Sequence, residues 1–339
     1  MKAAFYTGNK TFEIRDIEAK APAADEVAIK VAYNGICGTD MHAYHGAMDA
    51  RIGHNRIIGH EMSGTVAALG ASVSGLAIGD AVAVRPLRPC GNCPACNGGI
   101  SHICHNLKFL GLDSDGALQE QWNVPAYAVH KLPAGISLEH AALAEPVAVA
   151  CHDVRLGRVK AGEDVLIIGG GPIGILIGMV AKQAGAKVTI SEVNPHRLAI
   201  AEKLGFATLN PKDADVAATI MTKTGKKGAD VVFEVSGTQA GTSLMTEAAA
   251  SRGRIVMVAI HTKKPEVDLF RFFWRELELI GVRVYEKEDF DQAIDLIASG
   301  AIDGDTMITD IRGIDETGEA FAALDGNATA MKSLIRVAG

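Results

Sequence analysis

The spacing of apolar and polar residues changes near residue 160. Before that point, short segments alternate between apolar and polar side chains and are separated by glycine-rich turns, as at residues 27–31, 64–69 and 81–84. Alternation at every second position is typical of a strand with one buried face. Several such strands in succession predict a barrel-like fold for the first third of the chain.

After residue 160, continuous apolar strands alternate with helical segments. Residues 164–168 are typical of a strand buried on both faces, and a glycine turn and a helix to about Ala184 follow. Further strands are predicted at 187–190, 230–235 and 254–258, and a helix at 195–204. This alternation predicts a doubly wound parallel sheet. Beyond Tyr285 the pattern becomes mixed, with an amphipathic helix near residues 290–298.

A glycine motif follows the first strand of this second pattern. Gly169, Gly171 and Gly174 match G-x-G-x-x-G, and Pro172 and Ile173 open the predicted helix. Such glycines permit a tight turn, the close approach of a pyrophosphate and close packing of helix on strand. The helix N-terminus favours the anion. The alternative is that the glycines only shape the turn, but the strand before them and the helix after them favour dinucleotide binding.

Glu192 is the residue that bears on cofactor choice, because it ends the second predicted strand 18 residues after Gly174. A carboxylate at this place accepts hydrogen bonds from the adenosine ribose and repels a 2′-phosphate. The sequence therefore favours NAD over NADP. Arg197, five residues further on, is able to bind a phosphate and keeps NADP as the alternative.

Length, charge and hydropathy exclude several classes of protein. The 339 residues suggest about two domains. The net charge of −7, without any Lys/Arg-rich block, argues against a nucleic-acid or anionic-membrane surface. The N-terminal residues lack the apolar run of a secretory signal, and the most apolar stretch, residues 165–181, is short and broken by glycine and proline. We therefore expect a cytoplasmic protein that binds neither nucleic acid nor membrane.

Four of the six cysteines lie within 15 residues, spaced C-x2-C-x2-C-x7-C. In a cytosolic chain such crowding indicates a metal rather than disulfides. Four thiolates suit a tetrahedral Zn²⁺ without an open position, which is a structural site. An iron–sulfur cluster and free buried thiols are the alternatives. The four residues are Cys90, Cys93, Cys96 and Cys104.

A second group of chemically active residues precedes the glycine motif. Each member taken alone is a weak signal, since a single His or Glu is usually a surface or satisfied core residue. Together they supply a thiolate, imidazoles, a hydroxyl and two carboxylates. The group comprises Cys37, Thr39, His42, His60, Glu61 and Glu145.

These motifs resemble those of the zinc-dependent medium-chain dehydrogenases/reductases, most closely the sorbitol, polyol and 2,3-butanediol dehydrogenase branch. The resemblance runs over essentially the whole chain and rests on residues 37–42, 59–61, 90–104, 145–146 and 169–174. It implies a GroES-like β-barrel catalytic domain formed by residues 1–147 and 287–339, and a Rossmann dinucleotide-binding domain formed by residues 148–286. It also implies a homodimer or homotetramer.

The resemblance further implies a catalytic zinc held by Cys37 and His60, which makes two zinc ions per chain with the cysteine lobe. Glu145 stands at the family's third ligand position, but in the polyol branch the glutamate that matches Glu61 can be the direct ligand, with the one that matches Glu145 acting through a water. The sequence leaves that choice open. A carboxylate in place of a second thiolate makes the metal a harder Lewis acid, which suits the two oxygens of a vicinal diol.

The resemblance also implies a proton relay from the substrate through the Thr39 hydroxyl, the cofactor ribose and His42 to solvent, for which a histidine pKa is suitable. The alternatives are that Thr39 caps a helix and that His42 is merely exposed. Candidates for substrate contact, in a pocket expected between the domains, are Tyr44, Phe109 and Tyr285. The polyol branch often has an arginine before that last tyrosine, and Val284 in its place disfavours sorbitol itself.

We therefore expect an NAD-dependent oxidoreductase that acts on a secondary alcohol such as a vicinal diol, a polyol or a sugar acid. An L-threonine or other amino-alcohol dehydrogenase is the first alternative. A nucleotide-binding protein without catalysis and a zinc-free quinone reductase are disfavoured, because every candidate zinc ligand and relay residue is present. Cys151 and His152, on a helix beginning near Pro146, are expected to be structural.

Overall fold

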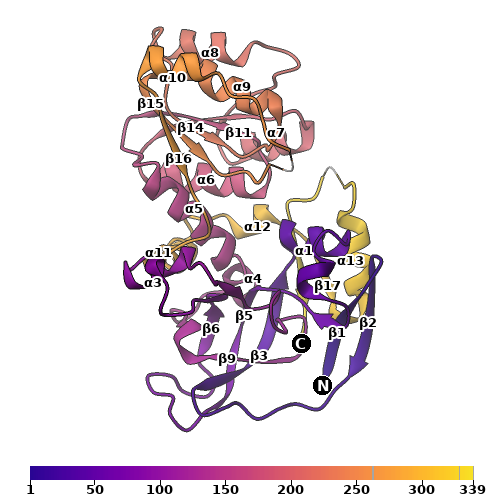
Figure 1. Ribbon diagram of the computed structural model, residues 1–339. Coiled ribbons are helices and arrows are strands. Elements are labelled where there is room, and N and C mark those ends of the chain that lie inside the picture. Colours follow the sequence, from indigo (N-terminus) through magenta and orange to yellow (C-terminus); the bar gives the residue numbers. More distant parts are fainter. Residues whose placement is uncertain (262, 328, 339) are drawn as a thin grey trace. The chain divides into compact units, whose positions relative to one another are not determined.

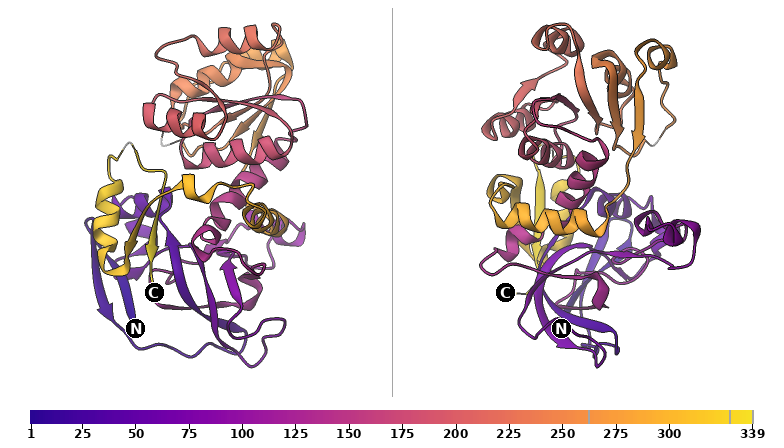
Figure 2. Two further views of the ribbon diagram at one scale, coloured as in Figure 1. Left: turned by 180° about the vertical axis from the view of Figure 1, so that it is seen from behind. Right: turned by 90° about the vertical axis from the view of Figure 1, so that its left-hand side faces the viewer.

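The computed structural model describes residues 1–261, 263–327 and 329–338, which fold into two compact units (Figure 1). Unit 1 contains Met1–Glu145, Glu286–Gly300 and Gly304–Gly339, and unit 2 contains Pro146–Tyr285 and Ala301–Asp303. The N and C ends marked in Figure 2 both belong to unit 1. Unit 1 is thus assembled from segments that are far apart in the sequence.

Unit 1 is built on a seven-stranded sheet with the order β10-β6-β5-β3-β18-β17, in which β9 also pairs with β3. The alternating strands predicted at residues 27–31, 64–69 and 81–84 are confirmed, and the first two are longer than expected. The last strand of the chain, β18, pairs antiparallel with β3, so that Leu334 lies opposite Gly35. The strands are β3 (Glu26–Gly35), β5 (Glu61–Leu69), β6 (Ala81–Val84), β9 (Gln121–Pro125), β10 (Val129–Lys131), β17 (Ile308–Gly313) and β18 (Lys332–Arg336).

Shorter elements complete unit 1. A second sheet has the order β2-β1-β4, and β7 pairs with β8. Helix α13 packs on β2 and β18, and Figure 1 shows it next to β2. It contributes Phe321 to the same apolar core as Tyr6, Ile29 and Trp122. The elements are β1 (Lys2–Gly8), β2 (Thr11–Asp16), β4 (Arg56–Ile57), β7 (Leu87–Arg88), β8 (Lys108–Phe109), α1 (Gly38–Tyr44), α2 (Asp49–Ile52), α3 (Pro94–Asn97), α4 (Leu138–Ala141), α11 (Lys287–Ala298), α12 (Gly304–Met307) and α13 (Thr317–Leu324).

A buried histidine of β10 makes the stability of unit 1 depend on pH. His130 is almost fully buried beside the Phe290 ring, and its Nδ1 lies 2.7 Å from a carboxylate oxygen of Asp291 on α11. Burial lowers the pKa of His130, and Asp291 only partly opposes this effect. The unfolded chain therefore binds a proton at a higher pH than the folded chain, so stability rises with pH through this range.

We expect His130 to lower the free energy of unfolding as the pH falls from 7 to 5, by at most about 1.4 kcal/mol per pH unit, and so to lower the melting temperature. His130→Gln should flatten this dependence, because the variant has no titrating imidazole. Burial would raise the pKa of Asp291, but Lys287 and His130 lower it below its ordinary value, so Asp291 is protonated only below this pH window and does not affect the test. Thermal unfolding of both proteins at several pH values measures the slopes, and equal slopes would contradict the assignment.

Unit 2 is a six-stranded parallel sheet with the order β13-β12-β11-β14-β15-β16. This is the doubly wound order of a dinucleotide-binding fold, with its change of direction between β11 and β14. The predicted strands and helices are confirmed, although β15 begins at Ala249, earlier than expected. The strands are β11 (Asp164–Ile168), β12 (Lys187–Ser191), β13 (Ala207–Leu209), β14 (Ala229–Glu234), β15 (Ala249–Met257) and β16 (Glu278–Gly281).

Helices cover both faces of this sheet. Figure 1 shows α8, α9 and α10 on one face and α6 on the other. Ile167 and Val232 are fully buried, as expected for strands covered on both sides. The helices are α5 (Ala144–Leu156), which begins in unit 1, α6 (Pro172–Gln183), α7 (Pro195–Lys203), α8 (Val216–Lys223), α9 (Gln239–Ala248) and α10 (Leu269–Arg275).

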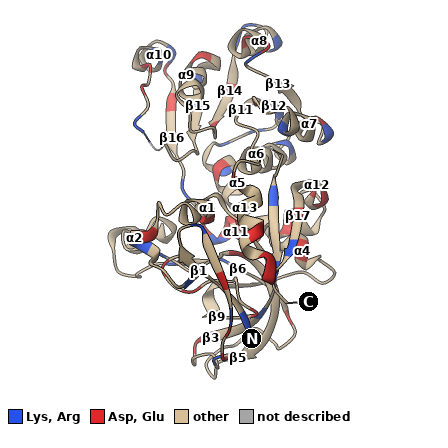
Figure 3. Ribbon diagram, turned by 90° about the vertical axis from the view of Figure 1, so that its right-hand side faces the viewer, with Lys and Arg blue, Asp and Glu red and all other residues tan. Residues whose placement is uncertain are grey.

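Acidic and basic residues are interspersed over both units, as Figure 3 shows, in keeping with a net charge of −7. Across the part of the chain that the structure describes, no helix combines the length and the apolar composition that crossing a bilayer requires.

Candidate functional site

The first candidate site lies where β3 and β5 of unit 1 pair. The antiparallel register places Gly35 opposite Glu61, which brings the segment after β3 next to the start of β5. As a result, ligand atoms of Cys37, His60 and Glu61 lie within 4.8 Å of one another. Residues that are more than twenty positions apart in the sequence thus form one group, with donors of three chemical kinds.

Asp40 organises this group from helix α1. Its Oδ2 accepts a hydrogen bond from the backbone N–H of Cys37 at 2.9 Å, and this bond holds Cys37 at the N-cap of the helix. Its Oδ1 lies 3.4 Å from Nδ1 of His60, and both side chains are buried. A carboxylate behind an imidazole is the usual arrangement around a metal-binding histidine, because it fixes the ring and its tautomer. Asp40 had no role in the sequence interpretation.

The protonation of this group fits a site that is completed by a cation. Burial raises the pKa of the Cys37 thiol, and the nearby Glu61 carboxylate adds to the effect. Burial alone would lower the pKa of His60, but Asp40 and Cys37 raise it well above its usual value. The buried Nδ1 of His60 and Oδ1 of Asp40 have no hydrogen-bond partner among the described residues. Thiolate, imidazole and carboxylate together suit Zn²⁺ with a position left open.

A lysine from the far end of the chain joins the group. Lys332 Nζ donates to Glu61 Oε1 at 2.7 Å and to Oε2 at 2.5 Å, and both side chains are buried. Glu145 acts on the same ammonium, since burial would lower the pKa of Lys332 but Glu61, Cys37 and Glu145 raise it. Glu145 is not in the 4.8 Å group. Sequence reasoning missed Lys332, because no local pattern marks a lysine 271 residues from its partner.

The other predicted residues of unit 1 occupy different surroundings. Phe109 packs edge-on against His60, with 5.1 Å between the ring centroids. Tyr44 is buried against Phe12 and Phe321, which favours a packing role. Tyr285, assigned to unit 2, is fully buried.

Thr39 and His42 both lie on α1. The N-cap of this helix is Cys37, so Thr39 is its second helical residue and not its cap. His42 is exposed in the last turn. Residues three apart share a helix face, so the hydroxyl and the imidazole project from the same side of α1.

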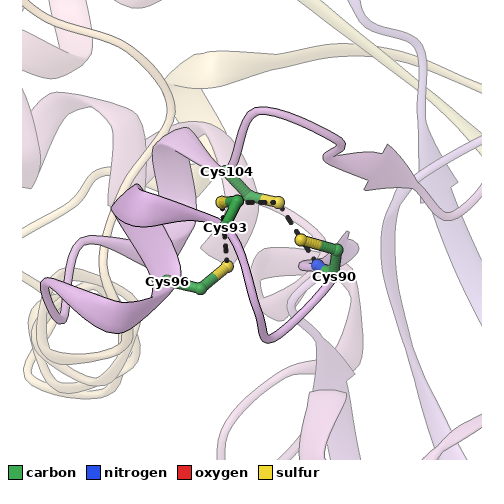
Figure 4. A group of neighbouring side chains, drawn as sticks. All are labelled: Cys90, Cys93, Cys96 and Cys104. Atoms are coloured by element: carbon green, nitrogen blue, oxygen red, sulfur yellow. Dashed lines mark hydrogen bonds between the residues drawn. The ribbon is translucent and has the colours of Figure 1, made fainter.

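The second candidate site is the cysteine lobe, where the four sulfur atoms converge (Figure 4). Cys93 Sγ lies 3.5 Å from Cys96 Sγ and 3.7 Å from Cys104 Sγ. These distances are far too long for disulfides. They are close to the edge of about 3.8 Å that a tetrahedron has when its Zn–S bonds are about 2.3 Å.

Backbone N–H groups point at these sulfurs, as a site for thiolates requires. Cys104 Sγ accepts from the N–H groups of Cys90 and Asn106 at 3.2 and 3.3 Å. The pKa of Cys90 is lowered to about 6, chiefly by the backbone N–H of Asn92, and the pKa of Cys93 is lowered by N–H groups of Cys96 and His105. Burial and the neighbouring Cys93 thiol instead raise the pKa of Cys96 to about 11. The lobe thus stabilises negative sulfur at Cys90 and Cys93, and a bound metal ion would be needed to hold all four cysteines as thiolates.

The third candidate site is the glycine turn of unit 2. Gly169 has φ +107°, and a Cβ on Gly174 would overlap the carbonyl oxygen of Gly169, so neither position accepts a side chain readily. Gly171 is the N-cap of α6, and a Cβ there would have only an Arg197 nitrogen near it, at 3.7 Å. Pro172 has no N–H, and the first helical bond comes from Ile175. The N–H groups of Ile173 and Gly174, which precede this first helical bond, can therefore face an anion.

Glu192 and Arg197 lie beside this turn. Glu192 Oε2 accepts from the Gly170 N–H at 2.8 Å, and its Oε1 accepts from the Val193 and Asn194 N–H groups at 2.7 and 2.9 Å. Arg197 Nη1 lies 3.8 Å from Oε2. Oε2 thus keeps a lone pair for a further donor.

A cavity of about 490 Å³ opens at this turn, at the carboxyl ends of the strands. Such an edge is where doubly wound sheets bind dinucleotides. Residues that line the cavity include Gly169, Gly171, Glu192, Arg197, Ser236 and Thr238.

Comparison with known proteins identifies the family to which the chain belongs. Residues 23–134 match the alcohol dehydrogenase GroES-like domain, and residues 172–299 match the zinc-binding dehydrogenase family. The chain belongs to the zinc-binding alcohol dehydrogenases. It is an oxidoreductase that transfers a hydride between a secondary alcohol and a nicotinamide cofactor with the help of zinc. The resemblance to the polyol branch and the pairing of a GroES-like with a Rossmann fold are confirmed.

Three relatives narrow the comparison. A 2-dehydro-3-deoxy-L-galactonate 5-dehydrogenase from Pseudoalteromonas atlantica is 55% identical over 99% of this chain and 98% of its own. An L-threonine 3-dehydrogenase from Pyrococcus horikoshii is 34% identical over 94% of this chain and 93% of its own. The crystal structure of 2R,3R-butanediol dehydrogenase from Bacillus subtilis has a TM-score of 0.92 at 32% identity, with 99% of each chain covered.

Proposed function

We propose that this enzyme oxidises the C5 hydroxyl of a six-carbon 2-keto-3-deoxy sugar acid, with 2-dehydro-3-deoxy-L-galactonate as the candidate substrate and NAD as the acceptor. The observation that carries the proposal is 55% identity to the Pseudoalteromonas enzyme over 99% of the chain. The sequence identity to the threonine dehydrogenase is lower, at 34%, so threonine is the less favoured substrate. The products are the C5 ketone, NADH and a proton.

We propose that Cys37 and His60 hold the catalytic zinc together with a carboxylate, and that Cys90, Cys93, Cys96 and Cys104 hold a structural one. Glu61 supports the first assignment as the carboxylate whose oxygen lies within 4.8 Å of the other two donors. Glu145, close enough to act on Lys332 but outside this group, would then not bind the metal directly. When bound, zinc supplies a Lewis acid for the substrate hydroxyl, and NAD accepts the hydride.

The chain's own residues provide the path of the proton. The Thr39 hydroxyl, two residues from Cys37, accepts the proton of the substrate hydroxyl and donates its own towards His42. His42 is exposed on the same helix face and releases the proton to solvent. Phe109 covers the edge of His60 and keeps that side of the metal-binding group apolar. Once the substrate hydroxyl has lost its proton, the C–H bond of the reacting carbon is the bond that breaks, and its hydrogen leaves as a hydride.

An assay of NAD⁺ reduction with 2-dehydro-3-deoxy-L-galactonate, L-threonine, 2,3-butanediol and sorbitol tests the proposed substrate. We expect kcat/KM for the sugar acid to exceed the others by at least roughly 100-fold, since 2,3-butanediol and sorbitol lack its carboxylate, and threonine lacks its further hydroxyls and adds an ammonium group. A chelator should abolish the activity, and added zinc should restore it. Preference for L-threonine or for a neutral diol would overturn the substrate assignment.

We also propose that Glu192 selects NAD. Glu192→Ala should lower kcat/KM for NAD⁺ by roughly 10-fold to 100-fold, because hydrogen bonds to a charged group are lost, while kcat/KM for NADP⁺ changes less or rises as repulsion of the 2′-phosphate disappears. Steady-state kinetics with both cofactors give the ratio. Glu192→Gln, which keeps the side-chain shape without the charge, is the matched variant. An equal loss for both cofactors would instead assign Glu192 to holding the Gly170 turn.

We further propose that the enzyme is a homodimer or homotetramer joined through β16 of unit 2. This strand ends the sheet order, and unpaired edges bind other strands. The neighbouring α10 exposes Phe270, Phe273 and Trp274 by 66–77%, which is typical of an interface. Light scattering should give a multiple of 35.5 kDa for the wild type and a smaller mass for Trp274→Glu. An unchanged mass for this variant would exclude α10 from the interface.

A further inference from the structure

Lys332 is a buried cation that forms an ion pair with the carboxylate of Glu61. Its side chain is 5% exposed, and its Nζ contacts both oxygens of Glu61 and, at 3.3 Å, the carbonyl oxygen of Ile36. Burying an ammonium group costs several kcal/mol unless close partners compensate it. The close contacts with Glu61 therefore compensate the desolvation of the Lys332 ammonium group. The role of Lys332 then depends on the role of Glu61.

The sheet of unit 1 makes room for this contact at Gly35. The strand order β5-β3-β18 puts β3 between Glu61 on β5 and Lys332 on β18. A Cβ at Gly35 would overlap Oε2 of Glu61, so the carboxylate lies across a position that only glycine leaves open. Glu61 thus reaches over the end of β3 to Lys332, while its oxygens stay within 4.8 Å of the donor atoms of Cys37 and His60.

Glu61 therefore lies between one cation and one place where a metal ion would bind. One is the ammonium group of Lys332, and the other is the space between Cys37 and His60. An ammonium that binds both carboxylate oxygens withdraws negative charge from them, and so weakens Glu61 as a donor to a metal ion. It also holds the carboxylate in place when no metal is bound.

We propose that Lys332 is a positioning residue that shares Glu61 with the catalytic metal, holding the carboxylate in the metal-free chain and reducing the negative charge that it presents to the bound ion. The inference rests on the proposed assignment of Cys37 and His60 as metal ligands. It goes beyond that assignment because Lys332, 271 residues from Glu61 in the sequence, then sets how strongly the Glu61 carboxylate donates electrons to the metal ion. A purely structural ion pair would stabilise the metal-free and metal-loaded protein equally.

Titration with Co²⁺, whose visible and thiolate charge-transfer absorption reports the ligand set, tests this role in the full-length enzyme. In Lys332→Met, Glu61 faces the ion with its full charge. We expect Co²⁺ to bind more tightly because a positive charge beside the ion is removed, by roughly 10-fold to 100-fold, which is the usual size of outer-shell effects. The absorption bands should shift, and the melting temperature of the metal-free protein should fall more than that of the loaded protein. Lys332→Arg should lie close to the wild type.

Two further variants sharpen the comparison. In a Glu61→Gln background, Lys332→Met should no longer alter Co²⁺ affinity, because the shared charge is gone. Lys131→Met, which breaks an exposed ion pair with Asp80, should change neither affinity nor spectrum. Where Lys332→Met does not fold, Lys332→Gln keeps a hydrogen-bond donor without the charge and should show the same shift of affinity and bands.

The outcomes separate this inference from the function on which it rests. Unchanged Co²⁺ affinity and bands in Lys332→Met, with equal loss of melting temperature in both metal states, would overturn the role of Lys332 and leave the ligand set intact. Co²⁺ binding and spectra that are indifferent to Cys37→Ser would refute the metal assignment itself.

Discussion

Thr39→Val is expected to lower kcat by roughly 100-fold to 10,000-fold, the usual contribution of a positioned acid or base. Valine matches threonine in size and in its branch at Cβ, so the packing of α1 should survive. The hydroxyl is lost as a proton acceptor and donor next to Cys37, and the substrate hydroxyl must then lose its proton directly to water. Steady-state kinetics with NAD⁺ and the preferred sugar acid measure the effect, and KM should change little.

Thr39→Ser is the matched control, because it keeps the hydroxyl and should retain most of the activity. His42→Ala tests the next step of the relay and should cost less, since solvent reaches this exposed position. A deuterium isotope effect on the transferred hydrogen that stays as in the wild type, with full activity of Thr39→Val, would remove Thr39 from the mechanism.

Local patterns of the sequence were sufficient to predict most of the fold. The parallel strands of unit 2 are continuous apolar runs, and G-x-G-x-x-G stands between β11 and α6 where the phosphate-binding turn belongs. The boundaries are less well determined. β15 begins at Ala249, five residues before the predicted start at Arg254, because pairing with β14 and not hydropathy sets its start.

Long-range contacts explain what the sequence could not reveal. The pairing of β18 with β3 brings Lys332 to Glu61 from the other end of the chain, and no periodicity or motif encodes that register. Asp40 lies three residues after Cys37 in the sequence, but its contact with His60 depends on the antiparallel pairing of β5 with β3. Tyr44 stays a candidate for substrate contact, and the packing of its ring against Phe12 and Phe321 is a set of contacts that the sequence did not reveal.

Cys104→Ser is expected to remove one metal ion per chain and to destabilise unit 1 by about 3–5 kcal/mol, as the loss of a buried structural feature does. For a unit of this size, that change corresponds to a fall in melting temperature of roughly 6–20 °C. The reason is geometric: Cys104 is buried, accepts two backbone N–H groups and lies 3.7 Å from Cys93, so three thiolates alone leave a tetrahedral ion with an open position. Elemental analysis and thermal unfolding measure the two effects.

Cys151→Ser provides the matched control, because Cys151 is equally buried but lies outside both cysteine-containing groups. It should keep the full metal content and lose less stability. If the protein is brown and contains iron, the lobe holds an iron–sulfur cluster and not zinc. A colourless protein that contains zinc supports the structural zinc site. Equal metal content in both serine variants would mean that the lobe holds its shape through N–H···S hydrogen bonds alone, and the stability of unit 1 would then not depend on metal.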